Sequence, residues 1–425
     1  MSDQPTEPHA RTDDHLPADG ASVDSPDADS SNSASGTSTP DPTGGSAASR
    51  ILDSLKVPVL AVFSALVLGA LLIMFTDDDV LWAWARFFND PIRALSRSAD
   101  TVWAAYSALL RGAVGSPGAI SETLLRATPL VFAGLAVAFA FKAALFNIGA
   151  NGQMIMGATL AAWVGFSLEV PGPLVIVVAL LGGVLGGAVW GGISGVLKAT
   201  TGAHEVITTI MLNFIAGLLL AYALTTDVFL PAGAANPISK RMLDQARLPR
   251  FIGGERVDLG IVLAVVAVVV IWWVLERSTF GFRVKAVGLN PHAARYAGMK
   301  VATITALTMA ISGGLAGIGG ATLPLGPGGS LTAGIIGFIG FDAIAVALLG
   351  RSNPFGVLAA GILFGALNAG AVTMQAETQI PVDIVTVIQA LIILFVAAPA
   401  LVRAIYRVRT AERDGPVFTS SWGAG

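Results

Sequence analysis

The residues of this chain that could do chemistry are mostly side-chain amides within apolar segments. Asn147, Asn151 and Gln153 interrupt one apolar run, and Asn213 and Asn368 lie inside two others. Amides in such places can satisfy backbone groups freed at a helix break, can hydrogen-bond neighbouring helices, or can line a path for a polar solute. For Asn147, Asn151 and Gln153 the sequence leaves two roles open, satisfying backbone groups at the break and lining a solute path. For Asn213 and Asn368 it favours helix–helix hydrogen bonds.

Asp342 is the only acid deep within an apolar segment. A charge in a membrane is costly, so such a residue faces protein or water. We predict that Asp342 caps a short helix that begins at Ala343, where the helix dipole favours an anion, in preference to contacting a solute. The residues that could line a solute path are Asn147, Asn151, Gln153, Asn213, Asp342 and Asn368.

Motifs for catalysis are absent from the sequence. The chain has no GxxxxGKS/T phosphate-binding loop, no HExxH, no GxSxG and no cysteine. Its four histidines lack the spacing of a metal site. The sequence therefore predicts no catalytic residue, no metal site and no cofactor bound by this chain.

The composition indicates a polytopic membrane protein. Hydrophobic residues make up 54% of the 425 residues and charged residues only 12%, about half the charge of an ordinary soluble domain. Glycine is abundant, at 49 residues, as in closely packed transmembrane helices. These proportions exclude a soluble enzyme and a nucleic-acid-binding protein that relies on a basic surface.

The two ends of the chain differ from its apolar body. Residues 1–50 hold nine acidic and two basic residues and almost no large apolar side chain, which predicts a disordered acidic cytoplasmic tail. Residues 51–405 form the membrane domain, and residues 406–425 form a C-terminal cytoplasmic tail. Within the domain, residues 76–125 mix charged and aromatic side chains and predict an extracytoplasmic, interfacial helical insertion.

The apolar runs predict an all-α fold of about ten transmembrane helices, because one span needs about 20 residues. Broken or re-entrant segments are expected near residues 325–330, where glycine and proline interrupt the pattern. Fifteen of the 25 Lys and Arg residues then share the side of the N-terminus, which predicts an N-in, C-in orientation. The predicted spans lie near residues 57–75, 126–146, 152–168, 173–197, 204–225, 259–275, 303–323, 334–350, 354–373 and 382–402.

Glycine recurs every four residues in the span near 173–197, and Gly313 and Gly317 repeat this spacing in the span near 303–323. Such patterns let helix backbones approach closely, so packing is the favoured role. No feature of the sequence separates a fixed contact from a sliding one.

The longest cytoplasmic hydrophilic segment, residues 277–300, contains a short helix with clear ends. Asn290 suits the N-cap, Pro291 the first helical position and Gly298 the left-handed residue after the helix. The residues that would give this helix a smooth face are Ala293, Ala294 and Ala297. Docking of another protein and a plain basic connector are equally open at this point.

Four segments resemble one family of transporters. Residues 277–300 are similar to the coupling loop of ABC importer permeases in the sugar and branched-chain amino acid permease superfamily. Residues 146–153, 202–216 and 340–354 resemble nucleoside permeases of the guanosine or purine type, and the resemblance covers about residues 120–402. It implies an ATPase-coupling site that consists of Gly281, Arg283, Ala286, Gly288, Asn290, Pro291, Ala293, Ala294 and Gly298.

The resemblance also implies a function and partners. The chain would be the permease subunit of an ABC importer in the plasma (inner) membrane, moving nucleosides by alternating access. A cytoplasmic ABC ATPase would use ATP and Mg²⁺, and a second permease subunit, an extracytoplasmic solute-binding lipoprotein and membrane lipid would be the other partners, with no nucleic acid. The alternative substrates are simple sugars such as pentoses.

Two other classes of function are less favoured. An ion-coupled secondary transporter needs an intramembrane carboxylate or sodium site, for which Asp342 is the only deep acid. A membrane scaffold that transports nothing would leave the polar breaks unexplained.

Overall fold

The computed structural model describes residues 47–251 and 253–407. Within these ranges the chain is helical apart from connecting segments and two isolated β-bridges, which pair Ile238 with Thr332 and Arg250 with Asp258. The predicted acidic tail, residues 1–50, and the predicted C-terminal tail, residues 406–425, lie almost entirely outside the described residues. A helical fold satisfies backbone polar groups inside each segment, as lipid requires.

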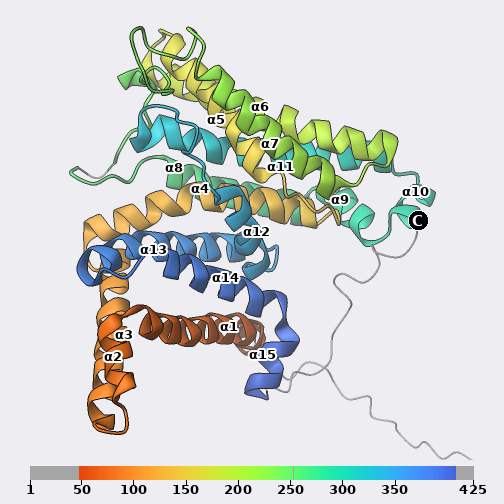
Figure 1. Cartoon of the computed structure of the whole chain (residues 1–425). Coiled ribbons are helices and arrows are strands. Elements are labelled where there is room, and N and C mark those ends of the chain that lie inside the picture. The colour runs from red at the N-terminus through yellow and green to blue at the C-terminus, as the bar shows by residue number, and fades with distance from the viewer. Residues whose placement is uncertain (1–46, 252, 408–425) are drawn as a thin grey trace, which may run out of the picture. The chain divides into compact units, whose positions relative to one another are not determined.

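Fifteen α-helices make up the described part of the chain (Figure 1). They are α1 (Ala47–Thr76), α2 (Asp78–Ala85), α3 (Pro91–Val114), α4 (Pro117–Phe141), α5 (Ala150–Ser167), α6 (Gly172–Thr201), α7 (Glu205–Ala223), α8 (Gly260–Arg277), α9 (Thr279–Leu289), α10 (Pro291–Tyr296), α11 (Val301–Leu323), α12 (Ile339–Leu349), α13 (Pro354–Thr378), α14 (Asp383–Ala397) and α15 (Pro399–Tyr406). A π-helical turn, η2 (Pro324–Gly328), follows α11.

Seven helical segments among the described residues are long and apolar enough to cross a membrane: Pro58–Thr76, Pro117–Phe141, Gly172–Thr201, Glu205–Ala223, Gly260–Arg277, Val301–Gly328 and Pro354–Thr378. The apolar helices α12 and α14 are shorter. Nine of the ten predicted spans each overlap one helix, including the span near 152–168, which corresponds to α5. The tenth, near 382–402, overlaps both α14 and the start of α15. The protein is thus a multi-pass helical membrane protein, while the count of ten and the orientation stay predictions.

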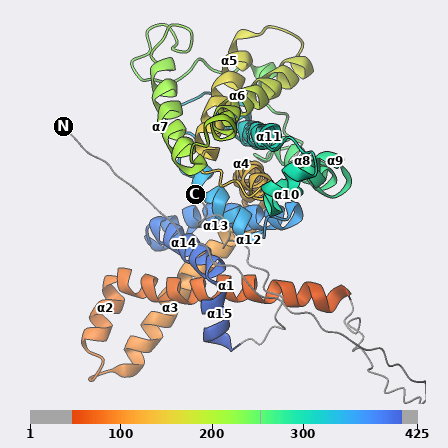
Figure 2. The same ribbon diagram turned by 90° about the vertical axis from the view of Figure 1, so that its right-hand side faces the viewer.

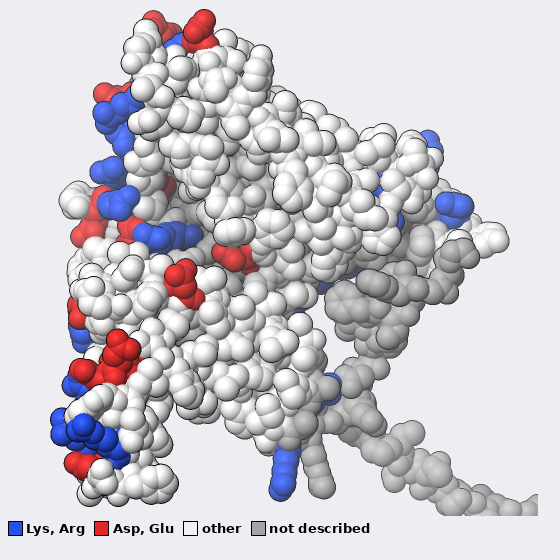
Figure 3. Space-filling model, in the orientation of Figure 1, with Lys and Arg blue, Asp and Glu red and all other residues white. Residues whose placement is uncertain are grey.

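Charged side chains separate along the bundle. In Figure 3 they gather along one edge of the visible face and at the opposite end, with a broad uncharged region between. The end that carries α9 and α10 is predominantly basic among the described side chains. Its bases are Lys142, Lys198, Arg277, Arg283, Lys285, Arg295, Lys300, Arg351, Arg403 and Arg407, against the acids Glu205 and Glu276.

Helix α4 is central to the bundle, since 78% of the residues in its most apolar stretch are buried. It contacts α8, α11, α12 and α13, and Figure 2 shows α4 and α11 side by side and nearly end-on. The predicted span began near residue 126, whereas α4 begins at Pro117 because Ser116 caps it by accepting a hydrogen bond from the Ala119 N–H at 3.1 Å. The last residues of the predicted 76–125 insertion therefore belong to this helix, and the rest forms α2 and α3.

Glycines bring α6 and α11 into backbone contact. A Cβ at Gly187 would lie 2.8 Å from the Gly317 Cα and still closer to the Gly313 carbonyl oxygen. A Cβ at Gly317 would lie 3.0 Å from the Gly187 Cα, and one at Gly157 on α5 would meet the Gly317 backbone. Helices α5, α6 and α11 therefore meet without side chains between them at this level, which supports the predicted packing role.

The segment after α11 is broken. Gly326 leaves helical geometry at φ −88° and ψ −136°, and a regular helix resumes only at α12, which has 11 residues. Eleven helical residues span roughly 16 Å, about half the hydrocarbon thickness. Residues 239–248 supply hydrogen bonds that the broken backbone lacks, since the Met242 N–H donates to the Gly329 carbonyl at 2.8 Å and the Leu248 N–H to the Leu325 carbonyl at 2.7 Å. Irregular backbone is tolerated in a membrane protein only with such partners.

The start of α12 corrects one prediction about Asp342. The helix begins at Ile339 with Phe338 at the N-cap position, and Asp342 lies within the first turn and is half-buried. The prediction that Asp342 caps a helix beginning at Ala343 is wrong by one turn. The Phe341 and Asp342 N–H groups already donate to the Phe338 carbonyl, at 2.8 and 3.0 Å, so the helix starts earlier than the side-chain pattern indicates.

Candidate functional site

The amides at the α4–α5 junction form one closed hydrogen-bond network. The Asn147 side-chain amide donates to the Gln153 Oε1 at 2.9 Å and to the Ser312 Oγ at 2.8 Å. In return the Gln153 amide donates to the Asn147 Oδ1 at 3.1 Å, and that oxygen also accepts the Gly149 N–H at 2.9 Å. Asn147 is 0% exposed and Gln153 1% exposed. In this conformation the two amides bond protein groups that the break between α4 and α5 would otherwise leave unsatisfied.

Two more predicted amides tie α5 to other helices. The Asn213 Oδ1 on α7 accepts the Gly152 N–H at 2.8 Å, and the Asn213 amide donates to the Ile148 carbonyl at 2.9 Å. The Asn151 Oδ1 accepts the Gly340 N–H of α12 at 3.3 Å. The structure therefore places Asn151 and Asn213, with Asn147 and Gln153, around the start of α5.

Asn368 lies apart from this group. It is half-buried on α13, and its Oδ1 accepts a hydrogen bond from the Gln389 amide of α14 at 2.9 Å. This is the helix–helix hydrogen bond that the sequence favoured for Asn368. A role of these amides in contacting solute stays a prediction.

Replacing Asn147 with leucine should lower the stability of the purified protein. The change leaves the Gly149 N–H and the Gln153 amide without an acceptor, at about 1–3 kcal/mol for each buried group. Thermal unfolding in detergent measures the loss, and Asn368→Leu, which removes one half-buried hydrogen bond, should cost less. Unchanged stability with lost uptake would instead assign Asn147 to solute contact.

Asp258 is a buried carboxylate that the sequence analysis did not single out. It precedes α8, is 3% exposed, and its Oδ1 accepts the Gly260 N–H at 2.8 Å. Its Oδ2 has no hydrogen-bond partner among the described residues, and a Cβ at Gly326 would lie 2.7 Å from it. Burial raises the pKa of Asp258 to about 6, opposed by the Gly260 hydrogen bond and by Arg250. No local pattern could reveal this, because the burial comes from the broken segment more than sixty residues later.

The raised pKa of Asp258 predicts that the folded protein is more stable against unfolding at acidic pH. The contribution of Asp258 is fully present below about pH 4, where the carboxyl is protonated in folded and unfolded chains, and it is lost as the pH rises through about 6. The full difference corresponds to about 3 kcal/mol. We expect the unfolding temperature to fall between about pH 4 and pH 6.5, and Asp258→Asn to reduce that fall. The same fall in the variant would assign the pH dependence to other groups.

Residues 277–300 are two helices joined at Asn290. The predicted caps of α10 are confirmed, since the Asn290 Oδ1 accepts the Ala293 N–H at 3.0 Å, Pro291 is the first helical residue and Gly298 has a φ of +80°. The residues before them, predicted as loop, form α9. Ser278 caps α9 by accepting the Gly281 N–H at 2.9 Å.

Two glycines fix α9 against the bundle. A Cβ at Gly281 would lie 2.7 Å from the Leu275 Cα of α8 and closer still to the Val274 carbonyl oxygen. A Cβ at Gly288 would lie 2.9 Å from the Ala143 Cα and closer to the Lys142 carbonyl oxygen at the end of α4. Gly281 and Gly288 therefore hold α9 in place, whereas Arg283 is exposed and Ala286 is half-buried.

The exposed face of α10 differs from the predicted one. Ala294 is 4% exposed and packs inward, while Ala293 and Ala297 are exposed and Tyr296 is 94% exposed. The structure therefore places Ala294 off the exposed face that the sequence assigned to Ala293, Ala294 and Ala297, and its place among the ATPase-coupling residues stays a prediction. Helix α10 has only six residues, and Ala294 is the one that it buries.

Comparisons with known proteins agree on one family. The family described as branched-chain amino acid transport system / permease component matches residues 119–397. The guanosine ABC transporter permease protein NupP of Bacillus subtilis is 36% identical over 83% of this chain and 96% of its own length. The glucose ABC transporter permease protein TsgB13 of Haloferax volcanii is 34% identical over 84% and 91%, and the nucleoside ABC transporter permease protein NupB of Lactococcus lactis is 32% identical over 82% and 92%.

A second guanosine ABC transporter permease protein of Bacillus subtilis, NupQ, is 26% identical over 58% of this chain and 79% of its own length. No solved structure matches the chain. The family match covers well over half of the sequence, and the apolar helices agree with it. The chain therefore belongs to the branched-chain amino acid transport system permease family, as a non-enzymatic, multi-pass plasma-membrane subunit of an ABC transporter that works with an ATPase and a substrate-binding protein.

Proposed function

We propose that this chain is the permease subunit of an importer that carries nucleosides. The observation that carries the proposal is the 36% identity to a guanosine permease over 96% of that protein's length, together with the similarity to a nucleoside permease of a second organism. A nucleoside is neutral and rich in hydrogen-bond donors and acceptors. A path that is lined by amides and has little buried charge suits such a solute.

Simple sugars are the second candidate class, because a glucose permease is 34% identical over most of both chains. An ion-coupled mechanism has lost its support, since the family works with an ATPase. Asp342 is therefore not needed as a binding site for a coupling ion.

The proposed assembly contains two different permease chains. NupP and NupQ of Bacillus subtilis are both named as guanosine permeases, and this chain is more similar to NupP, at 36% against 26% identity. A partner of the NupQ kind would complete the path for solute. We propose ten crossings of the membrane, one of them made by the broken segment and α12, with both ends of the chain on the side of α9 and α10. The basic character of that end supports this orientation.

Coupling to the ATPase is proposed to pass through α9 and α10. Helix α10 projects Ala293, Tyr296 and Ala297 to the surface at the basic end of the bundle, and Gly281 and Gly288 fix α9 beneath it. Closure of the ATPase would move α10 and shift the permease between its outward and inward conformations. ATP and Mg²⁺ are bound by the ATPase in this mechanism.

Uptake measurements test the substrate. Cells with the gene deleted and then restored are given labelled guanosine, with other nucleosides, glucose and pentoses as competitors. We expect uptake to return with the gene and to be suppressed by nucleosides and not by sugars. Suppression by sugars alone would reassign the substrate class.

A further inference from the structure

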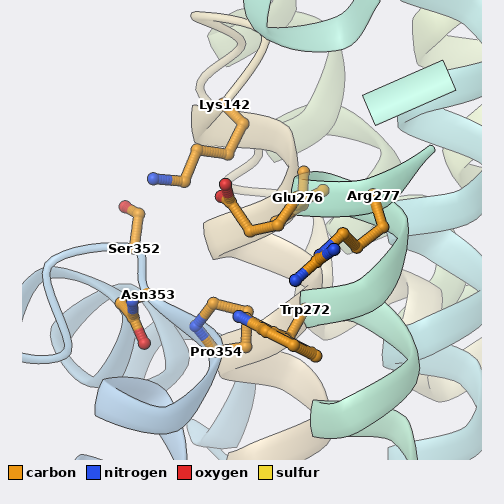
Figure 4. A pocket seen from close by; sticks show the side chains of 8 residues that line it. Lys142, Trp272, Glu276, Arg277, Ser352, Asn353 and Pro354 are labelled. Carbon is orange, nitrogen blue, oxygen red and sulfur yellow. The ribbon is translucent and has the colours of Figure 1, made fainter. Parts of the chain in front are cut away.

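A polar cavity lies at the basic end of the bundle, where α4, α8 and α13 meet (Figure 4). Its volume is about 420 Å³, and among the residues that line it are Lys142, Trp272, Glu276, Arg277, Ser352 and Asn353. In Figure 4, Lys142 and Arg277 reach in from different sides, and the Glu276 carboxylate lies between them. The cavity is separate from the amide network and from the exposed face of α10.

The cavity carries excess positive charge. Lys142 is half-buried, and no carboxylate among the described residues lies within ion-pair distance of its ammonium group. Glu276 accepts a hydrogen bond from the Lys285 ammonium at 3.1 Å, so its charge is already paired. Burial lowers the pKa of Lys142, Glu276 opposes this and Lys285 adds to it. An anion in the cavity would compensate the desolvated ammonium group.

The rim of the cavity is a strained turn. Arg351 and Ser352 are consecutive non-glycine residues in the left-handed region, with φ of 53° and 51°. Two such residues in succession cost free energy and persist only where the surroundings hold them. The Ser352 N–H donates to the Ala347 carbonyl at 2.8 Å, and this turn brings the Ser352 residue to the cavity. A hydroxyl donor and two cations are groups that bind a phosphate.

An apolar surface leads along α8 to the cavity. The exposed side chains Val262, Val265, Val266, Val269 and Trp273 recur at helical spacing, and Glu276 and Arg277 follow one turn later on the same side. Trp272 lies beside Phe355 of α13, with ring centroids 5.9 Å apart, under the polar groups. Tryptophan at the end of a span is typical of headgroup depth.

We propose that this cavity binds the phosphate group of an anionic membrane phospholipid, held by Lys142 and Arg277, with its acyl chains along the apolar surface of α8. A phospholipid fits better than an acidic side chain of a protein because the cavity continues into a lipid-facing apolar surface. Bound lipid would also lie next to residues that hold α9 in place, since Gly288 of α9 packs on the Lys142 carbonyl and Lys285 of α9 pairs with Glu276. The proposal rests on the chain being in a membrane and not on the solute it carries.

Native mass spectrometry of the full-length permease with its partner subunits tests this site. The sample holds equal amounts of phosphatidylglycerol and phosphatidylcholine, and the ratio of retained lipids is measured. We expect phosphatidylglycerol to be preferred, and each of Lys142→Gln and Arg277→Gln to lower the preference about fivefold. Lys300→Gln removes one cation at the same end, does not line the cavity, and should change the ratio by less than about twofold. Glu276→Gln removes the carboxylate and should raise the preference.

Three results would overturn the proposal. The first is an unchanged lipid ratio in all three cavity variants, and a defect in folding cannot hide it, because Glu276→Gln is expected to gain binding. The second is full displacement of phosphatidylglycerol by inorganic phosphate, which would show a site for the free ion. The third is loss of the ATPase from Lys142→Gln with lipid retention unchanged, which would make the cavity a protein contact.

Discussion

Replacing Ala293 with glutamate is expected to abolish uptake and to release the ATPase, while the amount of permease in the membrane is unchanged. Ala293 is exposed on α10, at the third helical position after the Asn290 cap. Glutamate at that position favours a helix, because it interacts with the helix N-terminus and its free N–H groups. The helix should therefore remain intact, and the charge should act on whatever protein α10 contacts. We expect the loss to be at least about 100-fold, the effect of several kcal/mol at a buried contact.

Co-purification of the ATPase with the tagged permease, alongside uptake, measures this effect. Ala235→Glu is the matched control, since it makes the same change at an exposed alanine in the segment between α7 and α8. It should retain the ATPase. Ala294→Glu should behave differently from Ala293→Glu, because Ala294 is buried and its replacement should lower the amount of folded protein. An Ala293→Glu permease that keeps both its ATPase and its uptake would remove the docking role from α10.

Replacing Gly187 with alanine is expected to be the most destabilising small substitution in the membrane domain. The new Cβ would occupy the space of the Gly317 Cα, at 2.8 Å, and of the Gly313 carbonyl. Both contacts are backbone, so no side-chain rotation can relieve them, and α6 and α11 must separate. Overpacking of this kind costs roughly 3 kcal/mol or more. The unfolding temperature and the amount of protein in the membrane should both fall.

Gly192 provides a control on the same helix. A Cβ there would lie 3.7 Å from the Ala310 Cβ, an ordinary contact distance. Gly192→Ala should be neutral or should stabilise the helix by about 0.5–1 kcal/mol, because alanine is the better helix former. Equal stability of the Gly187→Ala and Gly192→Ala proteins would contradict the backbone contact between α6 and α11.

Local features were predictable from the sequence. The ends of α10 follow from Asn290, Pro291 and Gly298, whose preferences depend on the nearest few residues. The polar residues that begin with Asn147 indicate a break before α5, although α4 already ends at Phe141, five residues before the end of the predicted span. The close approach of α6 and α11 follows from the spacing of glycine, although only the structure shows that backbone meets backbone at Gly187.

Features that depend on distant segments were not predictable. The burial of Ala294 depends on how a short helix turns toward the bundle, and its neighbours Ala293 and Ala297 have the same side chain. The true start of α12 depends on backbone hydrogen bonds to Phe338. The burial of Asp258 depends on Gly326, which comes from another part of the chain. In each case the residue type could be read from the sequence, whereas the distant segments that pack against it could not.

The backbone contact of α6 with α11 around Gly187 has a mechanical consequence. Where two backbones touch, there are no side-chain rotamers to rearrange, so we expect α6 and α11 to move together as one rigid pair. The link from α10 to α11 is short: the Met299 N–H donates to the Ala294 carbonyl at 3.0 Å, and α11 begins two residues later. In the proposed coupling mechanism, a movement of α10 would therefore be passed to α11 without first rearranging side chains at this contact. We expect the compliant part of the cycle to lie instead in the interrupted backbone after Pro324, and slower hydrogen exchange there than along α11 would refute this.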